Sequence, residues 1–256
     1  MEGGGIKGVV LDLSGVLYQA DEALPGAGEA LAELRQARLP LRFITNTTRS
    51  TGAALLSRLR GLGLEMAEHE LLTAARAARH LLQRRGLTPL LVIHPDLEPE
   101  FADLPSRAPD AVLVADAGER FSYPLLNEAF RLLMDGAPLL AINRNRYFAE
   151  GEALSLDAGP FVAALEYAAG VEAEVIGKPR PTLFETAARS MECPPDDCVM
   201  VGDDVESDVN GALAAGMAAL LVRTGKYQPE DSARMAEGGA EAADIRAAVD
   251  WITARL

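Results

Sequence analysis

The sequence predicts an α/β fold in which helices cover a parallel sheet, and three features of the chain support this. Short runs rich in Val, Leu and Ile alternate with longer stretches rich in Ala, Leu and Arg, as strands and helices do in layered α/β proteins. The short runs are apolar almost throughout, which is typical of buried parallel strands. Polar residues end or follow three of them, namely Asp12, Thr45 and Asp203. Because parallel sheets present functional side chains at the carboxyl ends of their strands, these residues mark a candidate site.

The two ends of the chain carry the elements of one predicted domain. Its strands are predicted at 7–13, 40–45, 198–203 and 218–222. Its helices are predicted at 25–38, at about 51–62 and in the segment ESDVNGALAAG. The polar segment EGGAEAA is predicted to be a connector before a last helix that ends near Trp251 and Leu256.

The middle of the chain has an alternation of its own. Its predicted elements are a helix at 73–85, strands at 89–93 and 111–115, a helix at 123–135, a strand at 138–142 and a helix at 160–169. A stretch of about 100 residues is long enough for a separate domain. Because strands of the first domain flank it, we expect residues 72–174 to be inserted into a core formed by 1–71 and 175–256.

Composition excludes several classes of function. The net charge of −14 argues against a general nucleic-acid or anionic-membrane binder, although a local basic cluster can still bind a small anion. The longest apolar runs fall short of the ~20 residues of a membrane span. The two cysteines, Cys193 and Cys198, without a secretory leader suggest the reducing cytoplasm. A zinc site would need more ligands near them.

Three motif matches are rejected on context. GGGIKG (3–8) has the spacing of a dinucleotide-binding loop but precedes a strand instead of following one. TGKY (224–227) has the Gly-Lys of a phosphate-binding loop but lacks the earlier Gly and the following Ser or Thr. Ser14 is not in a nucleophile elbow, because Asp12 stands where that motif has Gly.

Four short segments remain, and each has an ordinary alternative. They are Asp12-Leu13-Ser14-Gly15, Thr45-Asn46, Gly177-Lys178-Pro179, and Gly202-Asp203-Asp204 with Asp208. The Thr-Asn pair can cap the next helix, and Lys178 can be a surface lysine. The acidic residues can be solvated at the start of a helix, where its dipole favours them. Their shared placement at predicted strand ends instead favours one common site.

In this order, DLSG, TN, GKP and GDDxxxD resemble the four motifs of the haloacid dehalogenase superfamily of aspartyl phosphotransferases. The middle insertion resembles the large α/β cap of one subfamily, and the similarity extends over about residues 6 to 227. The resemblance implies a Rossmann-like core with a parallel sheet and an inserted α/β cap domain. It also implies a homodimer that pairs through the cap.

The resemblance assigns roles to the residues of the four motifs. Asp12 attacks phosphorus to form an aspartyl-phosphate that water hydrolyses, and Lys178 neutralises the phosphoryl charge. Mg²⁺ is the implied cofactor, since the ligands are hard oxygens; they are Asp12, the carbonyl of Ser14, Asp203, and Asp208 behind the metal or through a water. The implied substrate-binding residues are Ser14, Thr45, Asn46 and Lys178.

Ser14 departs from the pattern, because most phosphatases of the superfamily have a second aspartate there as general acid and base. Such a group typically contributes ~10²–10⁴-fold in rate. The main hypothesis is therefore a Mg²⁺-dependent phosphatase for small phosphorylated substrates with good leaving groups: pyrophosphate, phosphoramidates or aryl phosphates. The alternative is a catalytically weak protein that binds or signals through a phospho-ligand. A dehalogenase is disfavoured, because Asp203 and Asp208 preserve a metal site that it does not need.

Four residues of the insertion are candidates for lining the substrate pocket: Asn143, Arg144, Arg146 and Tyr147. Exposed loop residues are an equally good interpretation of this segment.

Overall fold

The computed structural model describes residues 5–150 and 153–256, and the chain divides into two compact units. The first unit contains the described residues up to Thr45, Leu55–Leu72 and Lys178–Leu256. The second contains Asn46–Ala54 and Thr73–Gly177. The chain thus leaves the first unit after the strand that ends at Thr45 and returns to it for good at Lys178.

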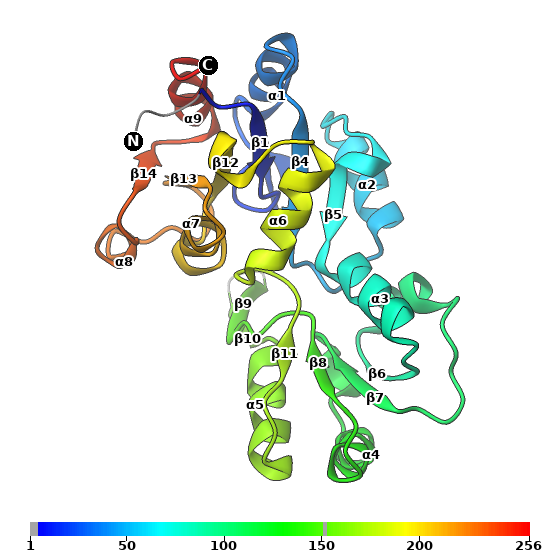
Figure 1. Ribbon diagram of the computed structural model, residues 1–256. Coiled ribbons are helices and arrows are strands. Elements are labelled where there is room, and N and C mark those ends of the chain that lie inside the picture. The colour runs from blue at the N-terminus through cyan, green and yellow to red at the C-terminus, as the bar shows by residue number, and fades with distance from the viewer. Residues whose placement is uncertain (1–4, 151–152) are drawn as a thin grey trace. The chain divides into compact units, whose positions relative to one another are not determined.

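The first unit is built on a six-stranded sheet with the order β14-β13-β12-β1-β4-β5 (Figure 1). The strands are β1 (Gly8–Leu11), β4 (Leu41–Thr45), β5 (Leu71–Thr73), β12 (Cys198–Gly202), β13 (Ala218–Val222) and β14 (Gly239–Ala242). Strand β1 pairs in parallel with β12 and β4, and β13 pairs in parallel with β12 and β14. Leu11 lies opposite both Val201 and Phe43. This register brings the carboxyl ends of β1, β12 and β4 to the same edge of the sheet.

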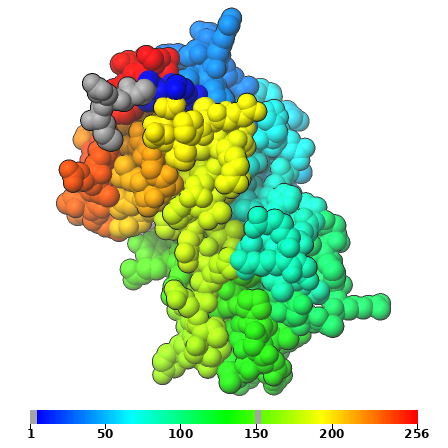
Figure 2. All heavy atoms as spheres, viewed as in Figure 1, coloured from blue at the N-terminus to red at the C-terminus, as the bar shows by residue number. Residues whose placement is uncertain are grey.

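Helices cover both faces of this sheet, which explains why its central strands are almost entirely apolar, with Arg42 of β4 as the charged exception. Side chains of α1 (Ala27–Gln36) and α9 (Ile245–Thr253) pack with Leu11 and Phe43 in one buried cluster. On the other face, α6 (Pro181–Ser190) contacts β1 and β4 and packs beside α7 (Gly211–Ala214). Figure 2 shows these last two segments side by side at the surface, in yellow and orange.

The remaining elements of the first unit are short, apart from α2 (Gly52–Gly61), whose first residues belong to the second unit. They are the hairpin β2 (Tyr18–Gln19) and β3 (Glu22–Ala23), η1 (Glu68–Glu70), η4 (Pro195–Asp197), the π-helical turn η5 (Val205–Asn210) and α8 (Asp231–Arg234).

The second unit has a four-stranded sheet with the order β11-β8-β7-β6. Its strands are β6 (Pro89–Val92), β7 (Ala111–Val114), β8 (Leu139–Ala141) and β11 (Glu174–Val175), all paired in parallel. Helix α3 (Ala74–Arg85) packs on the face that carries Leu113, whereas α4 (Tyr123–Met134) and α5 (Ala158–Ala169) pack on the face that carries Val112. The unit also has the antiparallel hairpin β9 (Tyr147–Glu150) and β10 (Ala153–Leu156), and the short helices η2 (Pro95–Phe101) and η3 (Gly118–Arg120).

The α/β fold with a parallel central sheet is confirmed, but two local predictions were wrong. The EGGAEAA connector contains β14, because pairing with β13 makes a strand of residues with little strand propensity. The segment that begins at Tyr147, for which exposed loop was one interpretation, forms the β9–β10 hairpin. The helix predicted in ESDVNGALAAG is present, as the contiguous helical segments η5 and α7. The GGGIKG segment lies partly outside the described residues. Among the described residues, no helix is long and apolar enough to cross a membrane.

Candidate active site

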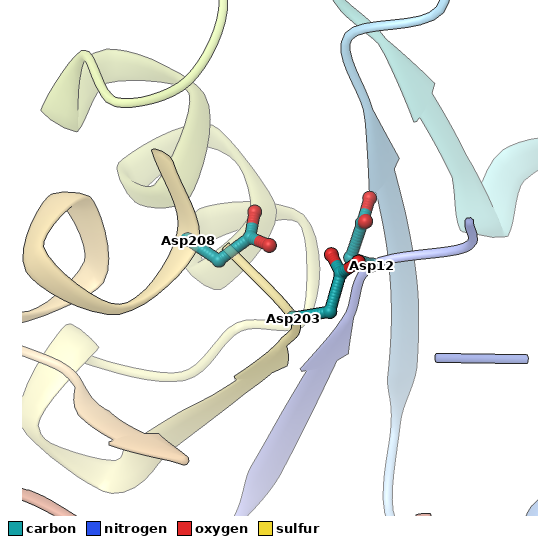
Figure 3. Close-up of side chains that lie close together, drawn as sticks. All are labelled: Asp12, Asp203 and Asp208. Atoms are coloured by element: carbon teal, nitrogen blue, oxygen red, sulfur yellow. The ribbon is translucent and has the colours of Figure 1, made fainter. Parts of the chain in front are cut away.

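Three aspartates meet at the carboxyl edge of the sheet in the first unit. Asp12 follows β1, Asp203 follows β12, and Asp208 lies in η5 (Figure 3). One carboxylate oxygen from each lies within 4.8 Å of the other two. Their exposed fractions are 7%, 2% and 0%. The alternative that Asp203 and Asp208 are solvated residues of a helix start is therefore wrong, and burying three acids together requires a cation.

Lys178 supplies one positive charge to this group of aspartates. Its Nζ donates to Oδ1 of Asp12 at 2.7 Å and to Oδ1 of Asp208 at 2.6 Å, and the side chain is only 4% exposed. Burial alone would lower the pKa of Lys178, but the charges of the two carboxylates outweigh it and raise that pKa. Lys178 is thus a buried, permanently charged group, and the alternative of a surface lysine is wrong.

The two carboxylate oxygens of Asp203 have different surroundings. Its Oδ2 accepts the backbone N–H of Lys226 at 2.7 Å, whereas its Oδ1 is buried without a hydrogen-bond partner among the described residues. Burial, and then the charges of Asp12 and Asp208, raise the pKa of Asp203 to about 8. An orphaned buried carboxylate oxygen beside two further carboxylates fits a hard divalent cation. The donor set therefore suits Mg²⁺.

Asp208 and Asp204 differ although they are close in sequence. Burial raises the pKa of Asp208 to about 7, although Lys178 opposes this. Asp204 instead caps η5, where its Oδ1 accepts from the backbone N–H groups of Glu206 and Ser207 at 3.1 and 2.9 Å. Burial would raise the pKa of Asp204, but the charge of Lys226 and the hydrogen bond from Ser207 lower it. Asp204 is therefore an ionised capping residue beside the three clustered acids.

Two glycines allow the loops around Asp203 to approach each other. Gly15 has φ 80° and Gly225 has φ 60°, both in the left-handed region. A Cβ at Gly15 would lie 2.0 Å from Oδ2 of Asp203, and one at Gly225 would lie 2.1 Å from the same atom. The hydroxyl of Thr224 donates to the carbonyl of Gly15. The loop after β1 and the loop after β13 therefore interlock around one carboxylate.

The other predicted site residues occupy different surroundings. Ser14 is exposed on the loop after β1, and Thr45 is buried at the end of β4, the strand beside β1. Asn46 belongs to the second unit, where a Cβ added to Gly177 would lie 2.4 Å from its Oδ1. Because α2 begins only at Gly52, the alternative that Thr45 and Asn46 cap that helix is wrong. The roles assigned to all of these residues remain predictions.

The candidates in the insertion are not all exposed loop residues. Asn143 is fully buried; its Oδ1 accepts the N–H of Asn145 at 3.1 Å, and its Nδ2 has no hydrogen-bond partner in the part of the chain that the structure describes. Arg144 pairs with Glu166 at 2.6 Å. Arg146 and Tyr147 are exposed. That these residues line a substrate pocket stays a prediction.

Sequence reasoning did not connect the segment Thr224–Lys226 with the aspartates. TGKY was rejected as a phosphate-binding loop, and the structure gives no reason to change that. The segment nevertheless follows β13 after a single residue, Arg223, at the same edge as Asp12 and Asp203. The rule that functional residues follow parallel strands could have found it.

Comparison with known proteins agrees with this geometry. The family model of haloacid dehalogenase-like hydrolases matches residues 9–104, and a model described as HAD-hydrolase-like matches residues 175–248. The chain is 46% identical over 230 residues to haloacid dehalogenase-like hydrolase domain-containing protein 2 of Rattus norvegicus, covering 90% of this chain and 89% of the relative. It is 44% identical over 233 residues to phospholysine phosphohistidine inorganic pyrophosphate phosphatase of Bos taurus, covering 89% and 86%.

Solved structures of phosphatases share the fold. A 4-nitrophenylphosphatase from Thermotoga maritima has a TM-score of 0.87 and 27% identity, over 96% of this chain and 97% of that one. A glycerol phosphate phosphatase from Mycobacterium tuberculosis, solved in complex with magnesium, has a TM-score of 0.83 and 27% identity, over 94% and 76%. The family expected from the four motifs is confirmed: this chain belongs to the haloacid dehalogenase-like hydrolases.

Proposed function

We propose that this protein is a Mg²⁺-dependent phosphatase that transfers a phosphoryl group first to Asp12 and then to water. The observation that carries the proposal is the buried group of Asp12, Asp203 and Asp208, with the unpartnered Oδ1 of Asp203 beside the charged Lys178. Asp12, Asp203 and Asp208, with the carbonyl of Ser14, would hold Mg²⁺. When bound, the ion supplies positive charge to the phosphoryl oxygens.

Asp12 is the nucleophile in this proposal. One of its oxygens accepts a hydrogen bond from Lys178, which orients the carboxylate. An Asp12 oxygen forms a bond to phosphorus while the bond from phosphorus to the leaving group breaks, and the leaving group takes the electron pair. Water then attacks the aspartyl-phosphate, which releases inorganic phosphate and restores Asp12. The hydroxyl of Thr45 and the N–H of Asn46 would bind the transferred phosphoryl group.

The substrate class follows from Ser14. A serine hydroxyl cannot protonate a leaving alkoxide at neutral pH, so the favoured substrates have leaving groups that are already weak bases. Pyrophosphate and aryl phosphates meet this condition, and so do phosphoramidates whose nitrogen is already protonated. Two similar proteins are named as an inorganic pyrophosphate phosphatase and a 4-nitrophenylphosphatase, which supports the same choice.

Ser14 also favours a second candidate function, a protein of this fold that binds a phospho-ligand with little turnover. Both candidates predict binding of Mg²⁺ and phosphate, and only the first predicts catalysis.

The test is phosphate release from 4-nitrophenyl phosphate with Mg²⁺ or with EDTA. We expect release that requires Mg²⁺ and that Asp12→Asn abolishes. Asp197→Asn is the matched control, because Asp197 belongs to the same unit but pairs with Lys7 at 2.7 Å beside the start of β1; it should retain activity. Binding of Mg²⁺ and phosphate without release would favour the second candidate, and release in EDTA would refute the metal-dependent mechanism.

We further propose that residues 72–174 form a cap domain that selects the substrate, and that the protein is a cytoplasmic homodimer paired through this cap. Tyr123 on α4 and Tyr167 on α5 are strongly exposed, which supports pairing through these helices. Cys193 and Cys198 are free thiols, which supports a reducing compartment. A monomer mass in solution would contradict the dimer.

A further inference from the structure

The loop after β13 places a second lysine against the acidic group. The backbone N–H of Lys226 donates to Oδ2 of Asp203 at 2.7 Å. Gly225 packs against Gly15 so closely that an added Cβ would lie 2.5 Å from the Gly15 Cα, and Thr224 bonds to the Gly15 carbonyl. The backbone of Lys226 is therefore fixed in direct hydrogen-bond contact with Asp203, a candidate metal ligand.

The ammonium group of Lys226 is held much less firmly than its backbone. Its side chain is 58% exposed, and its Nζ lies 3.4 Å from Oδ2 of Asp204, a carboxylate that already caps η5. A pair in which the lysine is mostly exposed and the carboxylate is 25% exposed contributes about 0–1 kcal/mol. Lys178 differs, because it is buried between Asp12 and Asp208 at 2.7 and 2.6 Å. Of these two lysines, Lys226 is thus the one that can leave its ion-pair partner, Asp204, and bind a substrate anion at little cost in free energy.

The chemistry of the proposed reaction requires a positive charge near the leaving group, which the ammonium group of Lys226 could supply. Ser14 cannot protonate the leaving group, so the charge that develops there must be stabilised in another way. A lysine ammonium is a compact point charge suited to phosphate oxygens. Placed beside a departing phosphate, it offsets the negative charge that the breaking bond delivers to that phosphate.

We propose that Lys226 binds the phosphoryl group that is not transferred, and so makes phosphoanhydrides such as pyrophosphate preferred substrates. This inference rests on the proposed phosphatase function, and it assigns Lys226 to substrate specificity. An aryl leaving group has no second phosphoryl anion for Lys226 to contact. The two substrate classes therefore distinguish its role from a general one.

The first experiment compares kcat/KM for pyrophosphate and for 4-nitrophenyl phosphate in excess Mg²⁺. Loss of a charged hydrogen bond of about 1.5–3 kcal/mol corresponds to about 10–100-fold. We expect Lys226→Gln to lose this factor with pyrophosphate but less than about 3-fold with the aryl phosphate, and Lys226→Arg to recover part of the loss. Lys7→Gln is the matched control: Lys7 is 62% exposed and pairs with Asp197 beside the start of β1. It should change neither value.

Two results would overturn the inference and assign Lys226 to positioning Asp203. One is an equal loss of kcat/KM on the two substrates. The other is weaker Mg²⁺ binding by Lys226→Gln that accounts for the loss of kcat/KM. A parent enzyme that hydrolyses the aryl phosphate but not pyrophosphate would also overturn it.

A second experiment separates this inference from the proposed function. In Asp12→Asn, which cannot form the aspartyl-phosphate, pyrophosphate binding in excess Mg²⁺ is measured by calorimetry. Adding Lys226→Gln should weaken that binding by about 10-fold or more. Unchanged binding refutes the role of Lys226 even where turnover is normal. Weakened binding supports that role even where the parent hydrolyses neither pyrophosphate nor the aryl phosphate.

Discussion

Replacing Asp203 by asparagine should stabilise the metal-free protein while destroying its affinity for Mg²⁺. Asparagine has nearly the same shape, and its amide oxygen can still accept the backbone N–H of Lys226. The substitution removes a carboxylate that is 2% exposed and close to Asp12 and Asp208. Without a metal, that carboxylate either stays charged in a buried acidic group or takes up a proton that the unfolded chain does not bind at neutral pH.

The size of the effect follows from the pKa. In the folded protein the pKa of Asp203 is raised to about 8, against about 3.9 in an unfolded chain. Protonated Asp203 therefore makes its full favourable contribution to the free energy of unfolding below about pH 3.9. This contribution is lost as the pH rises through about 8. At pH 7 the loss reaches at most about 4 kcal/mol. Because relaxation and water penetration lessen such penalties, we expect a gain of roughly 2 kcal/mol, or about 4–8 °C in Tm.

The assay is thermal unfolding in EDTA at pH 5, 7 and 8. The advantage of Asp203→Asn should grow with pH over this range. At about 100 times the Kd for Mg²⁺ the parent should gain about 2.7 kcal/mol, which reverses the order of the two proteins. Asp103→Asn is the control, because Asp103 is an exposed aspartate whose pKa is lowered by its hydrogen bond from Arg79; it should not gain stability. No gain for Asp203→Asn, or a gain that is the same at every pH, would refute the reasoning.

Three further predictions concern other parts of the site. Ser14→Asp should restore the missing acid and raise activity on alkyl phosphates by about 10-fold or more, with far less gain on aryl phosphates; phosphate release across both series measures this, and equal leaving-group slopes for parent and variant would contradict it. Lys178→Met leaves Asp12 and Asp208 buried without their cation, so it should abolish turnover and cost about 3–5 kcal/mol of stability in EDTA at pH 8; unchanged denaturant midpoints would contradict this. Deleting residues 72–174 and joining Leu71 to Val175 should leave a folded core that binds Mg²⁺ in calorimetry but no longer selects substrates, and a chain that fails to fold would show that the predicted boundaries are wrong.

The sequence predicted the central strands and the family because both depend on local signals. A strand buried on both faces is a nearly continuous apolar run, so β1, β12 and β13, and β4 despite its Arg42, stand out without knowledge of their neighbours. Asp12, Thr45 and Asp203 were notable because each polar residue ends or follows such a run. Since parallel strands present their carboxyl ends at one edge, local order along the chain was enough to predict that these residues approach one another.

Features that depend on distant partners were decided by the tertiary structure. Strand β14 exists because its backbone pairs with β13, and nothing in EGGAEAA itself favours a strand. Lys178 could be a surface lysine by sequence, and only its contacts with Asp12 and Asp208, 166 and 30 residues away, make it a buried cation. Lys226 became part of the site through its bond to Asp203, 23 residues earlier. Burial and electrostatic coupling are properties of the folded neighbourhood, so the charge state of these residues cannot be inferred from residue type and spacing alone.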